Sequence, residues 1–130
     1  MNIILRRVYD HESIESGSVS ILVDRIWPRG IAKAAANWDV WLKEVAPSND
    51  LRKWFAHDRE KWQEFQRRYF AELDAAGPAS EAVHELKKLL AGKHTAVFLY
   101  AAKDELCNNA VALKTYLEAL PGRSQAAARD

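Results

Sequence analysis

The sequence has few of the features that mark whole classes of proteins. Its single cysteine, Cys107, excludes an internal disulfide and suits a reducing compartment. The 19 lysine and arginine residues are balanced by 18 acidic ones, so the net charge gives no reason to expect a nucleic-acid partner. No apolar run approaches the roughly 20 residues of a membrane span, and residues 3–5 are too few for the apolar core of a signal peptide. We therefore expect a cytoplasmic protein with no membrane partner.

Motifs for metals, nucleotides and common catalytic sites are also missing. One cysteine and four scattered histidines give neither a CxxC nor an HExxH spacing, so no metal site is predicted. The glycine-rich loops GxxxxGK[ST] and GxGxxG, which bind phosphates through backbone amides, do not occur. No metal and no cofactor is expected, and function has to be inferred from clusters of side chains.

What the sequence does contain is the pattern of an α/β domain. Apolar, β-branched runs predict strands at residues 3–9, 19–25 and 95–101. The last run is apolar without a break, which indicates a strand covered on both faces. About eight residues join the first two strands, fewer than a parallel crossover needs, so these strands are antiparallel or separated in the sheet. We predict one domain over residues 1–120, with a small, mainly parallel sheet of about three strands wrapped by about five helices.

Helical spacing and capping residues predict where those helices lie. They are expected to begin near Asn37, Ser48, Asp58, Pro78 and Asp104. The apolar face of the first would consist of Trp38, Trp41, Leu42 and Val45. That of the longest would consist of Trp62, Phe65, Tyr69 and Leu73. The last would bury Leu106, Ala110, Leu113, Leu117 and Leu120 and end at Pro121-Gly122, leaving residues 121–130 as a frayed tail.

The segment Asp24–Gly30, which reads Asp-Arg-Ile-Trp-Pro-Arg-Gly, directly follows the second predicted strand. Ligands of open α/β sheets bind at the carboxyl ends of the strands. The planar guanidinium groups of Arg25 and Arg29 suit a phosphate or a carboxylate, and Trp27 can stack on a flat ring. The alternative is structural: an ion pair between Asp24 and an arginine, with Trp27 covering the core. Arg29, between proline and glycine, has the least reason to be structural.

A second polar cluster follows the third predicted strand. It contains Lys103, Asp104 and Asn108, and Asn108-Asn109 is an unusual pair for the opening turns of a helix. The structural alternative is that Asp104 only caps the last helix and Lys103 is a surface residue. If the second and third strands are parallel neighbours, Arg25, Arg29, Lys103, Asp104 and Asn108 converge on one crevice.

His57 and Cys107 are the remaining candidates for chemistry. His57 stands beside Asp58, and a histidine next to a carboxylate can act as a general base. The alternative is that Asp58 caps the long helix and His57 is a solvated linker residue. Cys107 lies near the start of the last predicted helix, where a nucleophilic or redox-sensing thiolate is conceivable. A partly buried, inert thiol is the interpretation that we favour.

Several blocks, in order, resemble the YeaO-like branch of the family known as domain of unknown function 488. They are Leu22–Gly30, Trp41–Glu44, Ala46–Ser48, Leu51–Asp58, Leu99–Glu105 and Asn108–Ala110. The resemblance covers about residues 3–120 and implies a shared fold. It implies no activity, because the family has none to transfer. A histidine is common in the family where this chain has Cys107, so no role for an imidazole is transferred to that position.

Two functional hypotheses follow. The leading one is an anion-binding crevice at the carboxyl ends of the strands, for a small phosphorylated or carboxylated molecule. Arg25, Arg29, Lys103 and Asn108 would bind the anion and Trp27 would stack; if the crevice is catalytic, Asp104 or His57 would transfer a proton. The alternative is a non-enzymatic module that binds a protein or nucleic acid through the Trp-rich segment 38–54. Burial of its tryptophans would remove that surface.

Overall fold

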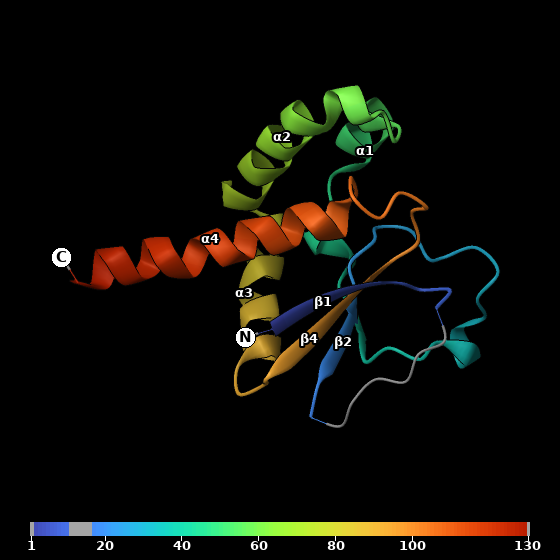
Figure 1. The fold of residues 1–130 in the computed structure, drawn as a ribbon, viewed down its shortest axis with the longest axis horizontal. Helices are drawn as coiled ribbons and strands as arrows, with labels where there is room; N and C mark the ends of the chain where they lie inside the picture. The colour runs from blue at the N-terminus through green and yellow to red at the C-terminus, as the bar shows by residue number, and fades with distance from the viewer. Residues whose placement is uncertain (1, 11–16, 130) are drawn as a thin grey trace.

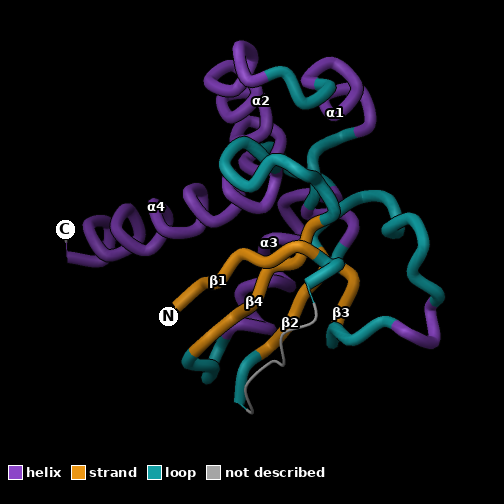
Figure 2. Tube along the Cα trace, turned by 45° about the vertical axis from the view of Figure 1, so that its right-hand side comes forward, coloured by secondary structure: helices purple, strands orange, loops and turns teal. Residues whose placement is uncertain are grey.

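Four parallel strands form one sheet in the computed structural model, which describes residues 2–10 and 17–129, residues 121–129 by their backbone alone. The strands are β1 (Asn2–Arg7), β2 (Val19–Leu22), β3 (Val40–Trp41) and β4 (Thr95–Tyr100). Their order in the sheet is β1-β4-β2-β3, and every neighbouring pair is parallel (Figures 1 and 2). The predicted parallel sheet is confirmed, with four strands where about three were expected.

The central strand β4 pairs with β1 on one side and with β2 on the other. Asn2 is opposite Thr95 and Arg7 is opposite Tyr100, while Val19 is opposite Ala96 on the other side. β1 and β2 are therefore separated in the sheet, which was one of the two arrangements predicted from their short connection. Most of that connection, residues 11–16, lies outside the described residues. Ala96 to Tyr100 are all buried, as the unbroken apolar run predicted.

Four α-helices lie within the described part of the chain, where about five were expected. They are α1 (Asn49–Phe55), α2 (Trp62–Asp74), α3 (Pro78–Leu90) and α4 (Asn109–Arg129). Short 3-10 turns span Lys33–Ala35, Lys43–Val45 and Arg59–Lys61. The side chain of Ser48 caps α1 as predicted, by accepting a hydrogen bond from Leu51 N. Gly77, with a φ of 145° that suits only glycine, precedes Pro78 at the start of α3.

The two faces of the sheet are covered differently. Side chains alternate along β4, so Ala96, Phe98 and Tyr100 point to one face and Val97 and Leu99 to the other. The first face is covered by all four helices, and its cluster includes the predicted stripe of Phe65, Tyr69 and Leu73 on α2. In Figure 2, α3 lies behind the strands on this side. The other face is packed by loop residues, chiefly Trp27, Ile31 and Trp38.

The helix predicted from Asn37 to Val45 is wrong. Val40 and Trp41 form β3, beside Ile21 and Leu22 of β2, and only Lys43–Val45 makes a 3-10 turn. Asp39 secures this pairing: its carboxylate accepts hydrogen bonds from Ser20 N and Ser20 Oγ at 2.9 and 3.2 Å. These contacts join residues far apart in sequence. A pattern of local spacing cannot show them, and they outweigh it here.

The predicted limits of the last helix are also wrong. α4 begins at Asn109, so Leu106 lies before it and is 67% exposed rather than buried. The helix continues through Pro121 and Gly122 to Arg129, and its end projects from the body of the protein (Figure 1). Proline removes one backbone hydrogen bond from a helix, but its fixed φ is helical, so it need not end one. Ala110, Leu113 and Leu117 are buried as expected.

Candidate functional site

A cavity of about 660 Å³ lies at the edge of the sheet where β2 and β4 end. Its walls come from the loop after β2, the connection before α1, the end of α1, and the loop after β4. They include Asp24–Arg29, Ala46, Pro47, Arg52, Lys53, Phe55–His57, Ala101, Ala102, Asn108 and Asn109. Since β2 and β4 are parallel neighbours, their carboxyl ends meet at this edge. It is the position where open α/β sheets bind ligands.

Arg25 contributes to the wall of the cavity, but its guanidinium is engaged in the fold. Nε donates to Pro47 O at 2.8 Å and Nη2 to Ala46 O at 3.1 Å. Nη1 is 3.6 Å from Glu44 Oε1. Arg25 thereby connects the loop after β2 to the segment that leads into α1. The structural alternative for this residue is supported, although the partner is Glu44 and not Asp24.

Arg29 is placed differently. Its side chain is exposed and lines the cavity, while its backbone oxygen accepts a hydrogen bond from Tyr9 Oη at 2.8 Å. Within the described ranges, its guanidinium has no hydrogen bond and no ion pair. Because its backbone is held and its guanidinium has no partner among the described residues, Arg29 is available to bind an anion.

Trp27 lines the cavity but also packs under it. Its ring centroid is 5.1 Å from that of Trp38 and 5.3 Å from that of Trp41, and its Nε1 donates to Ile31 O at 2.5 Å. The tryptophan therefore covers the face of the sheet opposite the helices, as its structural alternative proposed. Stacking of Trp27 on a ligand stays a prediction.

Asp24 is the only carboxylate among the described residues that line the cavity. Its Oδ2 accepts from Ala101 N at 2.9 Å and its Oδ1 from Asn109 Nδ2 at 3.1 Å. Burial raises the pKa of the Asp24 carboxyl, an effect that the two hydrogen bonds and the charge of His57 offset in part. These contacts join the loop after β2, the loop after β4 and the start of α4.

His57 is exposed on the wall of the cavity, at the turn that follows α1. Ala56 and His57 have positive φ angles of 46° and 60°, a conformation that is unfavourable for residues with a Cβ. The carboxylate of Asp58 accepts from Glu60 N at 3.0 Å and so caps the turn at the start of α2. Asp58 therefore caps the 3-10 turn that leads into α2 and not α2 itself, and it is not bonded to the imidazole. Within the described residues, the imidazole of His57 has no hydrogen-bonded carboxylate of the kind that orients a general base.

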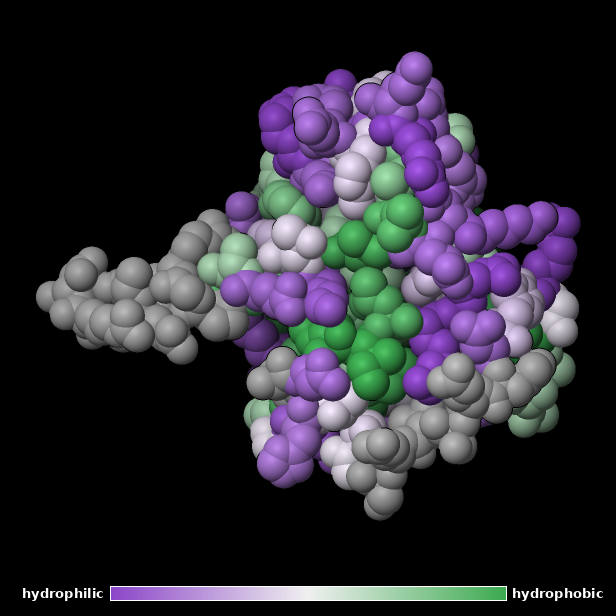
Figure 3. Space-filling model, in the orientation of Figure 1, coloured by the Kyte–Doolittle hydropathy of each residue, from purple (hydrophilic) through white to green (hydrophobic). Residues whose placement is uncertain are grey.

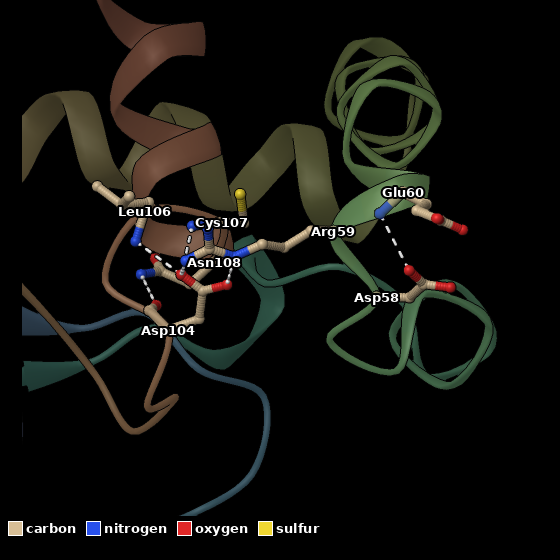
Figure 4. A network of polar contacts seen from close by, with 7 residues as sticks. All are labelled: Asp58, Arg59, Glu60, Asp104, Leu106, Cys107 and Asn108. Atoms are coloured by element: carbon tan, nitrogen blue, oxygen red, sulfur yellow. Dashed lines mark hydrogen bonds and ion pairs between the residues drawn. The ribbon is translucent and has the colours of Figure 1, made fainter.

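Lys103 and Asp104 do not reach the cavity, so the predicted convergence is only partly correct. Lys103 is an exposed loop residue. The carboxylate of Asp104 accepts hydrogen bonds from Arg59, Leu106 N and Cys107 N (Figure 4). It therefore caps the turn before α4 and not α4 itself. Because that helix begins five residues later than Asp104, the pair falls outside the crevice.

Asn108 lines the cavity as predicted, but it is 2% exposed and its side chain has structural partners. Oδ1 accepts from Val111 N at 3.0 Å, which makes Asn108 the cap of α4. Nδ2 donates to Asp104 O at 2.8 Å. Cys107 next to it is half-buried, a free thiol outside the cavity, and its sulfur points away from Asp104 (Figure 4).

Sequence reasoning missed the contribution of α1. Arg52 and Lys53 are both exposed and both line the cavity, with Phe55 beside them. The only sequence signal was a basic pair on the polar side of a short helix, and many surface helices have one. Among the described residues that line the cavity, Arg52 and Lys53 together with Arg25 and Arg29 make four cationic side chains against the single carboxylate of Asp24.

The tryptophans of segment 38–54 do not form one surface. Trp38 and Trp41 pack on one face of the sheet and Trp54 on the other, and all three are partly buried. Among the described large apolar residues, Ile26 and Leu106 are the exposed ones. Figure 3 shows an apolar strip at the centre of one face, bordered by hydrophilic residues.

The described part of the chain contains neither a cluster of metal ligands nor a membrane-spanning helix. No group of three or more histidine, cysteine or acidic side chains there is arranged to hold a metal ion. None of the helices in those residues is both long and apolar enough to cross a membrane.

The fold is thus a single-sheet α/β fold with a cavity at the carboxyl edge of its strands. The chain belongs to the family described as the inactive DUF488-N3 subclade, whose model matches residues 2–130. It is 39% identical over 122 residues to the uncharacterized protein YeaO of Escherichia coli strain K12, covering 92% of this chain and 100% of YeaO. It is 45% identical over 83 residues to the uncharacterized proteins Mb3100c of Mycobacterium bovis and Rv3073c of Mycobacterium tuberculosis, covering 64% of this chain and 66% of each relative. No solved structure matches. The resemblance to the YeaO-like branch is confirmed.

Proposed function

We propose that the cavity binds a small phosphorylated or carboxylated molecule, and that it does so without converting it. The observation that supports this most directly is the uncommitted guanidinium of Arg29 at the wall of the cavity. Arg52 and Lys53 add two exposed cations from α1. Like charges held near one another repel, and an anion in the cavity would relieve this repulsion.

Binding without turnover accords with the arrangement of the candidate catalytic residues. Asp104 lies outside the cavity, and Asp58 is bonded to a backbone amide and not to His57. The description of the family's subclade as inactive supports the same view. We also propose a cytoplasmic location, on the basis of the single cysteine.

Thermal unfolding with and without phosphate tests the proposal. A ligand that binds only the folded protein stabilises it by about 2.7 kcal/mol at one hundred times its Kd. We expect sodium phosphate to raise the Tm above that in sodium chloride of equal ionic strength, and Arg29→Ala to abolish the increase. Lys33→Ala, an exposed cation of the same loop outside the cavity, is the matched control and should keep it.

The unliganded Tm of Arg29→Ala should remain close to that of the wild type, because its guanidinium has no partner in the described structure. Equal phosphate effects in Arg29→Ala and the wild type would place the anion elsewhere. If neither phosphate nor a carboxylate such as citrate raises the Tm of the wild type, the proposal is wrong.

A further inference from the structure

The carboxylate of Asp24 lines a cavity in which the other charged side chains, among the residues that the structure describes, are cationic. It is partly buried at the end of β2, and its own backbone oxygen accepts a hydrogen bond from Trp41 Nε1 at 2.7 Å. Backbone and side chain are thus both held, and the position of the carboxylate in the cavity is fixed.

Within the described residues, the carboxylate of Asp24 accepts fewer hydrogen bonds than it can. An ionised carboxylate has about four lone-pair sites, and two of them are used, by Ala101 N and Asn109 Nδ2. No arginine or lysine of the described ranges forms an ion pair with it. Arg25, the next residue, turns instead to Pro47, Ala46 and Glu44. A carboxylate removed from water without a counter-ion is unfavourable.

The two kinds of charge occupy different depths of the cavity. Arg29, Arg52 and Lys53 are exposed, whereas Asp24 is partly buried beside the backbone of Ala101. The raised pKa of Asp24 is consistent with this setting. A simple anion would meet the cations and leave the carboxylate without a partner, or repel it.

We infer that the ligand has two unlike ends: an anionic group for the exposed cations and a positively charged amino group for the carboxylate of Asp24. This inference rests on the proposed function and narrows it to amino-bearing phosphates or carboxylates. An ammonium group supplies three hydrogen-bond donors and a positive charge, which is what the two free lone-pair sites of Asp24 lack.

Two probes of matched shape separate the inference from the proposed function. Phosphoethanolamine and propyl phosphate differ in one terminal group, an ammonium in the first and a methyl in the second. Calorimetric titration of the wild-type protein should give a Kd for phosphoethanolamine about tenfold lower or more, a difference of about 1.4 kcal/mol. Asp24→Asn should bind the two probes alike, with the affinity for propyl phosphate within about twofold of the wild type. Lys33→Ala should keep the preference.

The outcomes are distinct. Equal binding of both probes by the wild type would overturn the inference, assign Asp24 a purely structural role and leave the anion site intact. Binding of neither probe would overturn the anion site and the inference together. A preference that survives in Asp24→Asn would place the amino group elsewhere and overturn the inference. If Asp24→Asn does not fold, the comparison of the two probes on the wild type still decides.

Discussion

Arg59 donates two hydrogen bonds to the carboxylate of Asp104, at 2.8 and 2.9 Å (Figure 4). Arg59 lies in the turn before α2 and Asp104 in the loop after β4. The pair joins these two segments beside the cavity, and neither of the two side chains lines it. Together with the amides of Leu106 and Cys107, Arg59 holds the pKa of Asp104 well below its usual range. For this reason Asp104 stabilises the loop after β4 and does not donate a proton to the site.

Replacing Asn108 by alanine should destabilise the protein. The substitution removes the buried cap of α4 and leaves the partly buried amide Val111 N without its hydrogen bond. We expect a loss of about 2 kcal/mol in the free energy of unfolding, measured by urea denaturation. Asn108→Asp keeps an oxygen that can accept from Val111 N and should recover part of the loss. Equal stability of Asn108→Ala and the wild type would show that another residue caps this helix.

Phe65 tests the packing of α2. Its ring is 2% exposed and lies 4.3 Å, between centroids, from the ring of Phe55. Phe65→Ala should cost roughly 3–5 kcal/mol of unfolding free energy, the usual range for a buried phenylalanine. Phe70→Ala, on the same helix and only partly buried, is the control and should cost less. A cost below about 1 kcal/mol for Phe65→Ala would mean that the helix faces another way.

Glu64 should make stability depend on pH in acid. Hydrogen bonds from Arg67 and Arg68 lower its pKa from 4.5 to about 2. A carboxyl whose pKa is lower in the folded state stabilises that state above its unfolded pKa, and this stabilisation is lost as pH falls through the folded pKa. Between about pH 4.5 and 2 the wild type should therefore lose stability more steeply than Glu64→Gln. Denaturation curves across this range provide the measurement, and parallel pH profiles would contradict the assigned ion pairs.

Cys107 is expected to be a packing residue. Because it is half-buried and outside the cavity, Cys107→Ser should lower the unfolding free energy by less than about 1 kcal/mol and leave the effect of phosphate on the Tm unchanged. Modification by a thiol reagent at neutral pH, timed against a free cysteine peptide, is a second measurement. A rate well above that of the peptide would point to an activated thiolate instead.

Long apolar patterns predicted most of the strands and helices. They did not predict elements that are short or that depend on contacts between residues far apart in the sequence. The runs at β1, β2 and β4 and the stripes of α1, α2 and α3 identified these elements, because each buries enough apolar surface to be decided locally. β3 has only two residues and depends on contacts between Ser20 and Asp39. Because those contacts are non-local, the spacing of apolar residues in this segment predicted a helix instead. The start of α4 was misplaced because Asp104 and Asn108 are both good caps and only the structure shows which one is used.

The site was predicted in part for the same reasons. The rule that ligands bind at the carboxyl ends of parallel strands placed Arg25, Arg29 and Asn108 in one cavity. It could not show that Arg25 would be consumed by carbonyl oxygens, or that α1 would bring Arg52 and Lys53 to the same place. Those facts depend on how a helix packs against a loop, which has no local signature.

The pairing of β1 with β4 has a consequence for how the protein is made. Asn2 to Arg7 are synthesised long before their partners, Thr95 to Tyr100. At about 5–20 residues per second, the first strand waits several seconds without the neighbour that covers its hydrogen-bonding edge. Such long-range pairing slows folding, since the intervening loop has to close before any contact forms. The sheet can therefore be completed only after Tyr100 has been synthesised, and until then Ile3, Ile4 and Leu5 lack the strand with which they pair.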